Sequence, residues 1–155
     1  MSLKVGIVDV RRGSGVKIIE PANLYGCSIG DDSFVGPFVE IQRNVVIGKR
    51  VRVQSHSFIC EKTTIGDDCF VGHGVMFVND LFRTGGPAGG DPEKWGSIVI
   101  GNHVSLGSNA TILPVTIADH VVVGAGAVVT RDLSEPGIYA GNPARLIRPL
   151  PGADS

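Results

Sequence analysis

The sequence has few aromatic residues, few cysteines and almost no net charge. Aromatic residues make up 6% of the 155 residues, with a single tryptophan, which is typical of a narrow core. The net charge of −1 shows no excess of basic residues of the kind that nucleic-acid-binding proteins carry. The sequence contains no run of 18 apolar residues, the length that a membrane-spanning helix needs, and no signal peptide is apparent. We therefore expect one domain without a membrane-spanning segment.

The cysteines exclude a disulfide framework. Cys27, Cys60 and Cys69 are odd in number and lack CxxC spacing. This pattern suits a reducing compartment, so we expect a cytoplasmic protein. Cys69 occupies a small inward position of the repeat described next, so its expected role is packing.

Glycine is abundant, with 22 residues, and the sequence repeats with a period of six. A period of six fits neither an α-helix nor a long alternating strand, but it fits a hexapeptide β-helix of short strands and turns. The apolar residues that lead nine successive hexads are Ile29, Val35, Ile41, Ile47, Val53, Ile59, Ile65, Val71 and Phe77.

Three hexads make one triangular coil of 18 residues, with one strand on each of three parallel sheets. We name the faces A, B and C, beginning with Ile29 on face A. The repeat resumes at Ile100 on face A, and Ile18 and Leu24 lead an earlier partial coil. The sequence therefore predicts an all-β fold, a parallel β-helix of about six triangular coils.

The irregularities of the repeat fall at one edge, where face C turns into face A. The steps from Leu24 to Ile29 and from Ile112 to Ile117 are one residue short, and an insertion spans residues 83–99. We interpret this insertion as a flap over a neighbouring subunit, the alternative being a loop without a fixed surface. The expected organisation is a lead-in (1–17), the β-helix with its flap (18–133) and an irregular C-terminal segment with a tail (134–155).

The hexads, the late flap and the motif YAGNPARLI at residues 139–147 resemble the left-handed β-helix acyltransferases. The segments NLYGCSIGDDSFVGPFVEIQ, SHSFICE, VGHGVMFVNDLF and SNATILPVTI more narrowly resemble the nucleotide-sugar 3-N-acetyltransferases. The resemblance implies a left-handed helix and a homotrimer whose active sites lie between subunits. It also implies acetyl-CoA as co-substrate and no resident metal. The implied acceptor is the 3-amino group of UDP-2-acetamido-3-amino-2,3-dideoxy-glucuronate, for surface polysaccharide. A dTDP-3-amino-3,6-dideoxyhexose and another amine or hydroxyl acceptor remain alternatives.

Small residues at the end of face B form the expected acetyl-CoA surface. Gly72-His73, Gly107-Ser108 and Gly124-Ala125 occupy equivalent places in successive coils, where an extended pantetheine chain would approach the backbone. The alternative is that these glycines only turn corners. Arg145 and Arg148 would meet the CoA phosphates through their planar guanidinium groups, unless they are merely solvated.

The polar residues before the flap are the expected acceptor site. Asn79 would orient the sugar amine, Asp80 would accept its proton and Arg83 would pair with a carboxylate or diphosphate. His73 would act as a base or hydrogen-bond the substrate. Glu61 would support Asn79 or bind sugar hydroxyls, the alternative being a surface carboxylate. The alternative for Asn79 and Asp80 is a turn into the flap.

The four histidines raise a metal alternative. His56 and His73 are expected one coil apart at the corner between faces B and C, and His103 and His120 form a second stack. Zinc requires three or four ligands, and two-deep stacks do not supply them within one chain. Exposed or corner positions are therefore expected. A metal-binding or non-catalytic trimeric β-helix remains an alternative to an enzyme.

Overall fold

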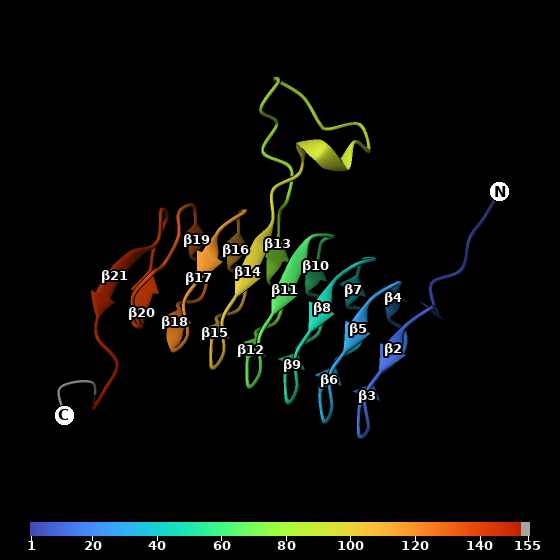
Figure 1. Cartoon of the computed structure of the whole chain (residues 1–155), viewed down its shortest axis with the longest axis horizontal. Coiled ribbons are helices and arrows are strands. Elements are labelled where there is room, and N and C mark those ends of the chain that lie inside the picture. The colour runs from blue at the N-terminus through green and yellow to red at the C-terminus, as the bar shows by residue number, and fades with distance from the viewer. Residues whose placement is uncertain (153–155) are drawn as a thin grey trace.

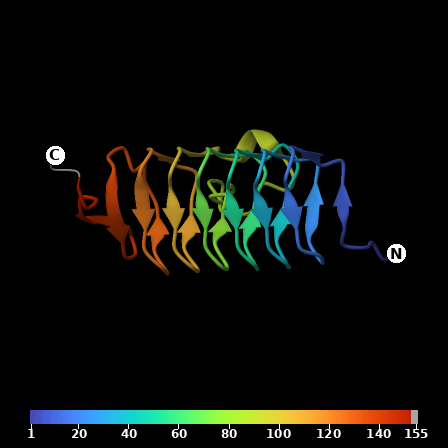
Figure 2. The same ribbon diagram turned by 90° about the horizontal axis from the view of Figure 1, so that it is seen from below.

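The structure is a computed structural model that describes residues 1–152. It is a parallel β-helix whose coils stack along the long axis, with the N-terminus at one end and strand β21 at the other (Figure 1). Figure 2 shows the flap on one side of an otherwise regular prism. Within the described residues, no helix is long and apolar enough to cross a membrane.

Three parallel sheets form the faces of the prism. Face A is the six-stranded sheet of β2 (Arg11–Arg12), β5 (Ser28–Ile29), β8 (Val46–Ile47), β11 (Thr63–Ile65), β14 (Ile98–Ile100) and β17 (Thr116–Ile117). Face B is the eight-stranded sheet of β3 (Lys17–Ile18), β6 (Phe34–Val35), β9 (Arg52–Val53), β12 (Phe70–Val71), β15 (Ser105–Leu106), β18 (Val121–Val123), β20 (Gly137–Ala140) and β21 (Arg145–Arg148). Face C is the seven-stranded sheet of β1 (Ile7–Val8), β4 (Asn23–Tyr25), β7 (Glu40–Ile41), β10 (Phe58–Ile59), β13 (Met76–Phe77), β16 (Thr111–Ile112) and β19 (Val128–Val129).

Strand pairing confirms the predicted hexad register. Ile29 pairs with Ile47, and Ile65 pairs with Ile100, so the repeat resumes on face A after the insertion as expected. The hexad leaders point inward and stack as a continuous aliphatic core, in which Ile41, Ile59 and Phe77 are fully buried. Each leader packs on its equivalents one coil away, which gives a narrow core close-packed along its length.

The corners repeat a backbone conformation as well as a sequence. The fourth residue of most hexads has a positive φ, close to +60° in a run of corners that includes Asp32, Asn44, His56, Asp68 and Gly74. Asp, Asn, His and Gly adopt this left-handed conformation more readily than other residues, which explains their recurrence there. Three of the four histidines, His56, His103 and His120, have this conformation.

Strands form at both ends of the chain, in segments where the sequence predicted none. In the expected lead-in, β1 and β2 extend the faces, and the helix has about seven coils instead of six. The expected irregular segment contains β20, which pairs in parallel with β18, and β21, which runs antiparallel to β20. Tyr139 continues the inward alternation and is buried. The antiparallel strand covers a sheet edge that would otherwise expose unpaired backbone groups.

Candidate functional site

The flap leaves face C after β13 and returns at β14, and it is fastened at its base by two side chains. The Asp80 carboxylate accepts from the N–H of Phe82 at 3.0 Å and from the N–H of Ala88 at 2.7 Å. The Lys62 ammonium donates to the carbonyl oxygens of Pro92, at 2.5 Å, and Trp95, at 3.3 Å. The flap, which contains the short 3-10 helix η1 (Pro92–Lys94), therefore folds back over its own prism.

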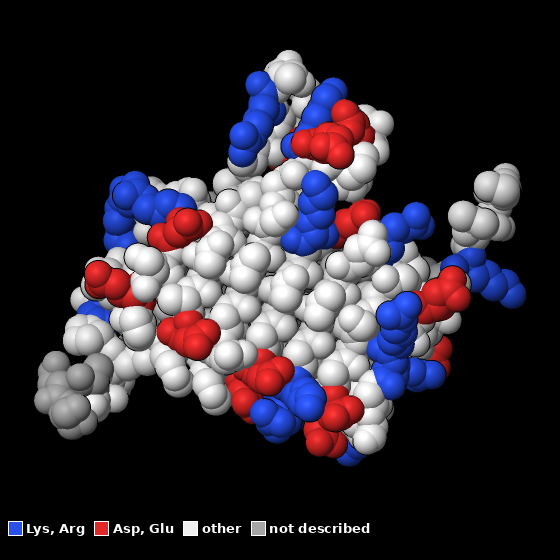
Figure 3. Space-filling view, in the orientation of Figure 1, with Lys and Arg blue, Asp and Glu red and all other residues white. Residues whose placement is uncertain are grey.

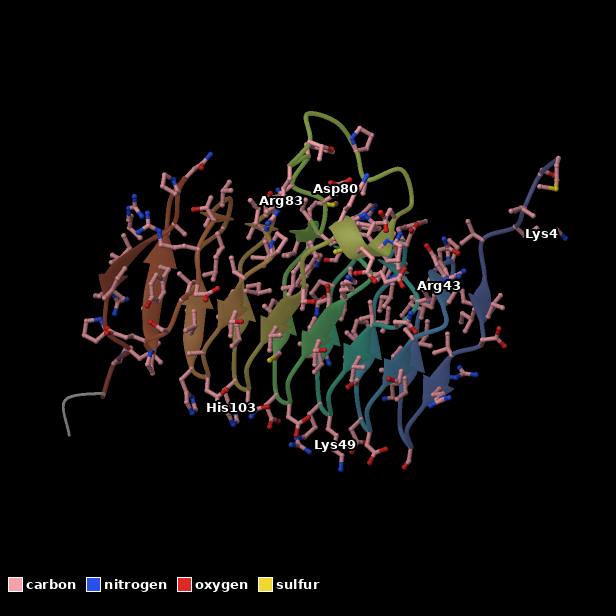
Figure 4. The ribbon with its side chains drawn as sticks, turned by 45° about the horizontal axis from the view of Figure 1, so that its top comes forward. Lys4, Arg43, Lys49, Asp80, Arg83 and His103 are labelled. Atoms are coloured by element: carbon pink, nitrogen blue, oxygen red, sulfur yellow. The ribbon has the colours of Figure 1, made fainter. Side chains whose placement is uncertain are left out.

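Asp80 thus has a structural role in this chain. Both carboxylate oxygens bind N–H groups of the flap, as the turn alternative required. Asp80 also lines a cavity of about 350 Å³ enclosed by the flap itself, together with Arg83, Lys94 and Trp95. Figure 4 shows Asp80 and Arg83 side by side at the base of the flap.

Asn79 and Glu61 are joined in a network at the corner between faces C and A. The Asn79 side-chain amide donates to the Glu61 carbonyl oxygen at 2.9 Å. The Glu61 N–H donates to Gln42 Oε1 at 3.1 Å, and the Glu61 Oε1 accepts from Asn44 Nδ2 at 3.0 Å. Two amide side chains from the coil before Glu61 and one from the coil after it therefore fix the backbone and the carboxylate of this residue.

A groove of about 410 Å³ separates this corner from the flap. Tyr25, Arg43 and Glu61 line it on the side of the prism, and Pro92 and Trp95 line it on the flap. Since Trp95 lines both hollows, the groove and the smaller cavity are neighbours. Burial, with a contribution from the adjacent Glu40, raises the pKa of the Tyr25 phenol, which is therefore neutral near pH 7.

The glycines of the expected cofactor surface are required by the close packing of neighbouring coils. A Cβ on Gly107 would lie 2.5 Å from the Ala125 nitrogen, and one on Gly72 would lie 2.7 Å from the Leu106 oxygen. The N–H groups of Gly72, Gly107 and Gly124 donate to carbonyl oxygens of the next coil. These glycines allow coils to stack, so their smallness alone does not indicate a ligand.

The residues that follow these glycines have a different backbone environment. The N–H groups of His73, Ser108 and Ala125 donate to no acceptor within residues 1–152. At the corner between faces A and B, by contrast, side chains of the neighbouring coil accept the equivalent N–H groups, as Asp67 does for Lys49 and Asp119 for Asn102. The corner between faces B and C therefore presents a row of unpaired donors, which we call the donor row (His73, Ser108 and Ala125).

The predicted catalytic residues do not all come together within one chain. His73 and Asn79 lie at opposite ends of the rung that contains β13, and the six residue steps between them span at most about 20 Å when fully extended. His73 is exposed, whereas Asn79 is half-buried under the flap. Arg145 and Arg148 are exposed on β21, in the sheet that ends at the donor row, and Arg145 pairs with Ala140.

The histidines form no metal cluster among the described residues. His103 and His120 stack with ring centroids 4.9 Å apart, and the His103 Nε2 lies 4.0 Å from the Asp68 carboxylate. His56 lies beside the Phe38 ring, with centroids 5.0 Å apart. His56 and His73 lie in adjacent columns instead of one, because coils repeat every 18 residues and these two are 17 apart.

Charged groups gather at the edges of the prism. Figure 3 shows face A nearly free of charge, with acidic and basic side chains along its lower edge and on the flap. At the lower edge, the Arg50 guanidinium binds the Asp68 carboxylate at 2.6 Å and lowers its pKa.

Burial raises the pKa of the Cys27, Cys60 and Cys69 thiols to about 11, so all three are unreactive thiols near neutral pH.

Sequence comparisons identify the family. Residues 26–61 match the family "Bacterial transferase hexapeptide (six repeats)", and residues 97–131 match "Hexapeptide repeat of succinyl-transferase". The chain is 33% identical to galactoside O-acetyltransferase of Escherichia coli (strain K12), over 82% of this chain and 66% of that protein. The chain belongs to the hexapeptide-repeat transferases, and the predicted left-handed β-helix is confirmed. It spans about a third of the length of other curated relatives that it matches.

Two solved structures are similar across most of the chain. A hexapeptide-repeat-containing acetyltransferase of Vibrio cholerae O1 biovar eltor, complexed with acetyl coenzyme A, has a TM-score of 0.68 and 27% identity. The similarity covers 81% of this chain and 71% of that one. AntD, an N-acyltransferase from Bacillus cereus solved as a variant with dTDP and coenzyme A, has a TM-score of 0.55 and 25% identity. The similarity covers 90% of this chain and 83% of the AntD chain.

Proposed function

We propose that this protein is an acetyl-CoA-dependent N-acetyltransferase that acetylates the 3-amino group of a nucleotide-linked amino sugar, for surface polysaccharide synthesis. The proposal of acetyl transfer rests on the similarity to an acetyl-CoA-bound acetyltransferase over 81% of the chain. The likeness to AntD, an N-acyltransferase solved with dTDP and coenzyme A, supports an amine acceptor and a nucleotide-linked substrate. The expected acceptor is of the UDP-2-acetamido-3-amino-2,3-dideoxy-glucuronate type, with dTDP-3-amino-3,6-dideoxyhexoses as the alternative.

The donor row gives this proposal a place for acetyl-CoA. The amides of a pantetheine chain carry carbonyl oxygens that would accept from the N–H groups of Ser108 and Ala125, which have no acceptor in the described part of the chain. A free N–H at this corner is also a suitable donor to the oxyanion that forms when the thioester carbonyl is attacked. Arg145 and Arg148 remain the proposed partners of the CoA phosphates.

The reaction is a transfer from sulfur to nitrogen. The neutral amine attacks the thioester carbonyl carbon, the C–N bond forms and the C–S bond breaks, and the proton lost by nitrogen restores the thiol of CoA. An amine needs less general-base assistance than a hydroxyl, for which such help is worth roughly 10² to 10⁴-fold.

The two proposed half-sites lie on different edges of the prism. The donor row follows face B, and Asn79, Arg83 and the groove follow face C. A homotrimer with active sites between subunits would bring the donor row of one chain to the flap edge of the next. Asn79 is then a positioning residue that holds Glu61, because its amide donates to the Glu61 carbonyl oxygen.

A second candidate is acetyl transfer to a sugar hydroxyl, which the 33% identity to a galactoside O-acetyltransferase favours. Purified protein is incubated with acetyl-CoA and UDP- or dTDP-linked 3-amino sugars, and in parallel with galactosides, while free thiol is followed. We expect thiol release with a 3-amino sugar only. Release with galactosides alone would favour the second candidate. No release and no acetyl-CoA binding would refute both, and stoichiometric zinc would then favour a metal-binding β-helix.

A further inference from the structure

The groove between the flap and the corner of faces C and A contains two opposite charges that do not neutralise each other. Arg43 and Glu61 both line it, yet they form no ion pair, and Arg43 has no carboxylate within 4.0 Å among the described residues. Figure 4 shows Arg43 on the prism below the flap, separate from Arg83. A groove with one exposed cation and one fixed anion suits a ligand that carries both signs of charge.

Glu61 is more firmly held than a surface carboxylate requires. Asn44 binds its Oε1, Gln42 binds its N–H and Asn79 binds its carbonyl oxygen, so the side chain and the backbone are both fixed. Its second oxygen, Oε2, has no hydrogen-bond partner within residues 1–152 and is available to a ligand. Carboxylates oriented in this way lose little entropy when they bind, which is how a site is preorganised.

The walls of the groove suit a sugar. The Trp95 indole and the Tyr25 phenol line it, and aromatic faces pack against the apolar C–H face of a pyranose ring. The volume of about 410 Å³ lies in the range of small-molecule sites. The flap wall is fixed to the prism by the Lys62 ammonium, so both walls are in place without the ligand.

We propose that this groove binds the acceptor as a zwitterion, with Glu61 Oε2 holding the amino group and Arg43 holding a carboxylate or phosphate of the same molecule. The inference rests on the proposed function and adds specificity-determining residues to it. It selects an amino sugar that carries its own negative charge close to the amine. Neither a neutral galactoside nor an isolated amine satisfies both ends of the groove.

The chain offers a matched control for Arg43. Arg131 follows its hexad leader Val129 by two residues, as Arg43 follows Ile41, so both lie at the same place on the same edge. Arg131 is exposed like Arg43, but it lies beyond the flap and lines neither hollow. Arg43→Gln and Arg131→Gln therefore remove the same charge from equivalent corners, and only the first changes the groove.

The test is calorimetric binding of three probes to the full-length protein. They are UDP-2-acetamido-3-amino-2,3-dideoxy-glucuronate, the analogue with a 3-hydroxyl in place of the amine, and the analogue without the sugar carboxylate. Arg43→Gln should weaken binding of the first probe about 10-fold or more, as expected for a charge-assisted hydrogen bond, and Arg131→Gln less than about 2-fold. Glu61→Gln, which keeps an acceptor for Asn44, should abolish the preference for amine over hydroxyl.

Two results would overturn the inference while leaving the proposed function intact. One is acetyl transfer by the wild type together with equal affinities for the two arginine variants. The other is an amine preference that survives Glu61→Gln. If the wild type binds acetyl-CoA but acetylates no amino sugar, while the groove variants still alter probe binding, the proposed function fails and the groove stands. Absence of binding by every probe would overturn the inference together with the UDP-linked acceptor of the proposed function.

Discussion

The fastening of the flap makes a prediction that does not depend on the substrate. Lys62→Met removes the ammonium that donates to the carbonyl oxygens of Pro92 and Trp95, while keeping a side chain of similar length. A hydrogen bond to a charged group contributes about 1.5–3 kcal/mol when buried. Lys62 is only half-buried, so we take about 1 kcal/mol for each bond, or about 2 kcal/mol in total.

A loss of about 2 kcal/mol raises the population of the open flap roughly 30-fold. The β-helix itself should be unaffected, because Lys62 contributes only its side chain to the flap and the core beneath it is continuous. The flap contains Arg83 and Lys94, two sites of tryptic cleavage. When opening is fast relative to cleavage, the nicking rate follows the open population.

The assay is limited trypsin digestion, with thermal unfolding measured in parallel. We expect Lys62→Met to be nicked in the flap at least 10-fold faster than the wild type, with an unchanged melting temperature. Lys49→Met is the control, since Lys49 lies at another edge and its nearest carboxylate is 3.9 Å away. Equal nicking rates for the two variants would refute the fastening. A lower melting temperature for Lys62→Met would show that the residue supports the prism instead.

Three shorter predictions follow from the packing and the charges. Gly107→Ala, whose Cβ would lie 2.5 Å from the next coil, should cost about 1–3 kcal/mol in urea unfolding, whereas Gly86→Ala, with open space around it, should be neutral. Arg50→Gln removes the partner that lowers the pKa of Asp68, and this stabilisation exists above the unfolded pKa of an aspartate. The urea midpoints of Arg50→Gln and the wild type should therefore differ at pH 7 and converge as the pH falls below about 4. A difference in midpoint that does not change with pH would show that the Arg50–Asp68 pair is not its cause. The three buried thiols, with pKa values of about 11, should resist a disulfide reagent at pH 7.5 until the protein is unfolded; rapid labelling of the native protein would contradict their burial.

The fold was predictable because each hexad repeats the same local physics. Ile65 and Ile100 were assigned to the same face across the insertion, and their backbones pair in the structure. The ends were less predictable. The sequence around β1 and β2 lacks regular leaders, and these strands form because the coil above them offers unpaired backbone groups.

The site was harder to predict because its contacts cross coils. Asn79 and Glu61 were singled out together, and the structure joins them through the Glu61 backbone. Gln42 and Asn44 were missed, although they lie 19 and 17 residues before Glu61, at the spacing of one coil. Polar side chains near 18-residue spacing at one corner were the signal that would have found them. Arg43 gives no such signal, since its proposed role depends on its having no carboxylate partner among residues 1–152.

The separation of the two half-sites leads to a test of the proposed trimer. Within one chain, the donor row and Asn79 lie at opposite ends of a rung, at most about 20 Å apart. If each active site uses the donor row of one chain and the flap edge of another, two inactive variants should complement each other. Ser108→Trp blocks the donor row, and Asn79→Ala disturbs the flap edge. Mixed trimers unfolded and refolded together at equal amounts should recover about a quarter of wild-type activity, because each intact edge is present in half of the chains. Either variant refolded alone should stay inactive. If the mixture also stays inactive while trimers of the wild type refold and recover, both edges act within one chain, and the assignment of the donor row to acetyl-CoA is wrong.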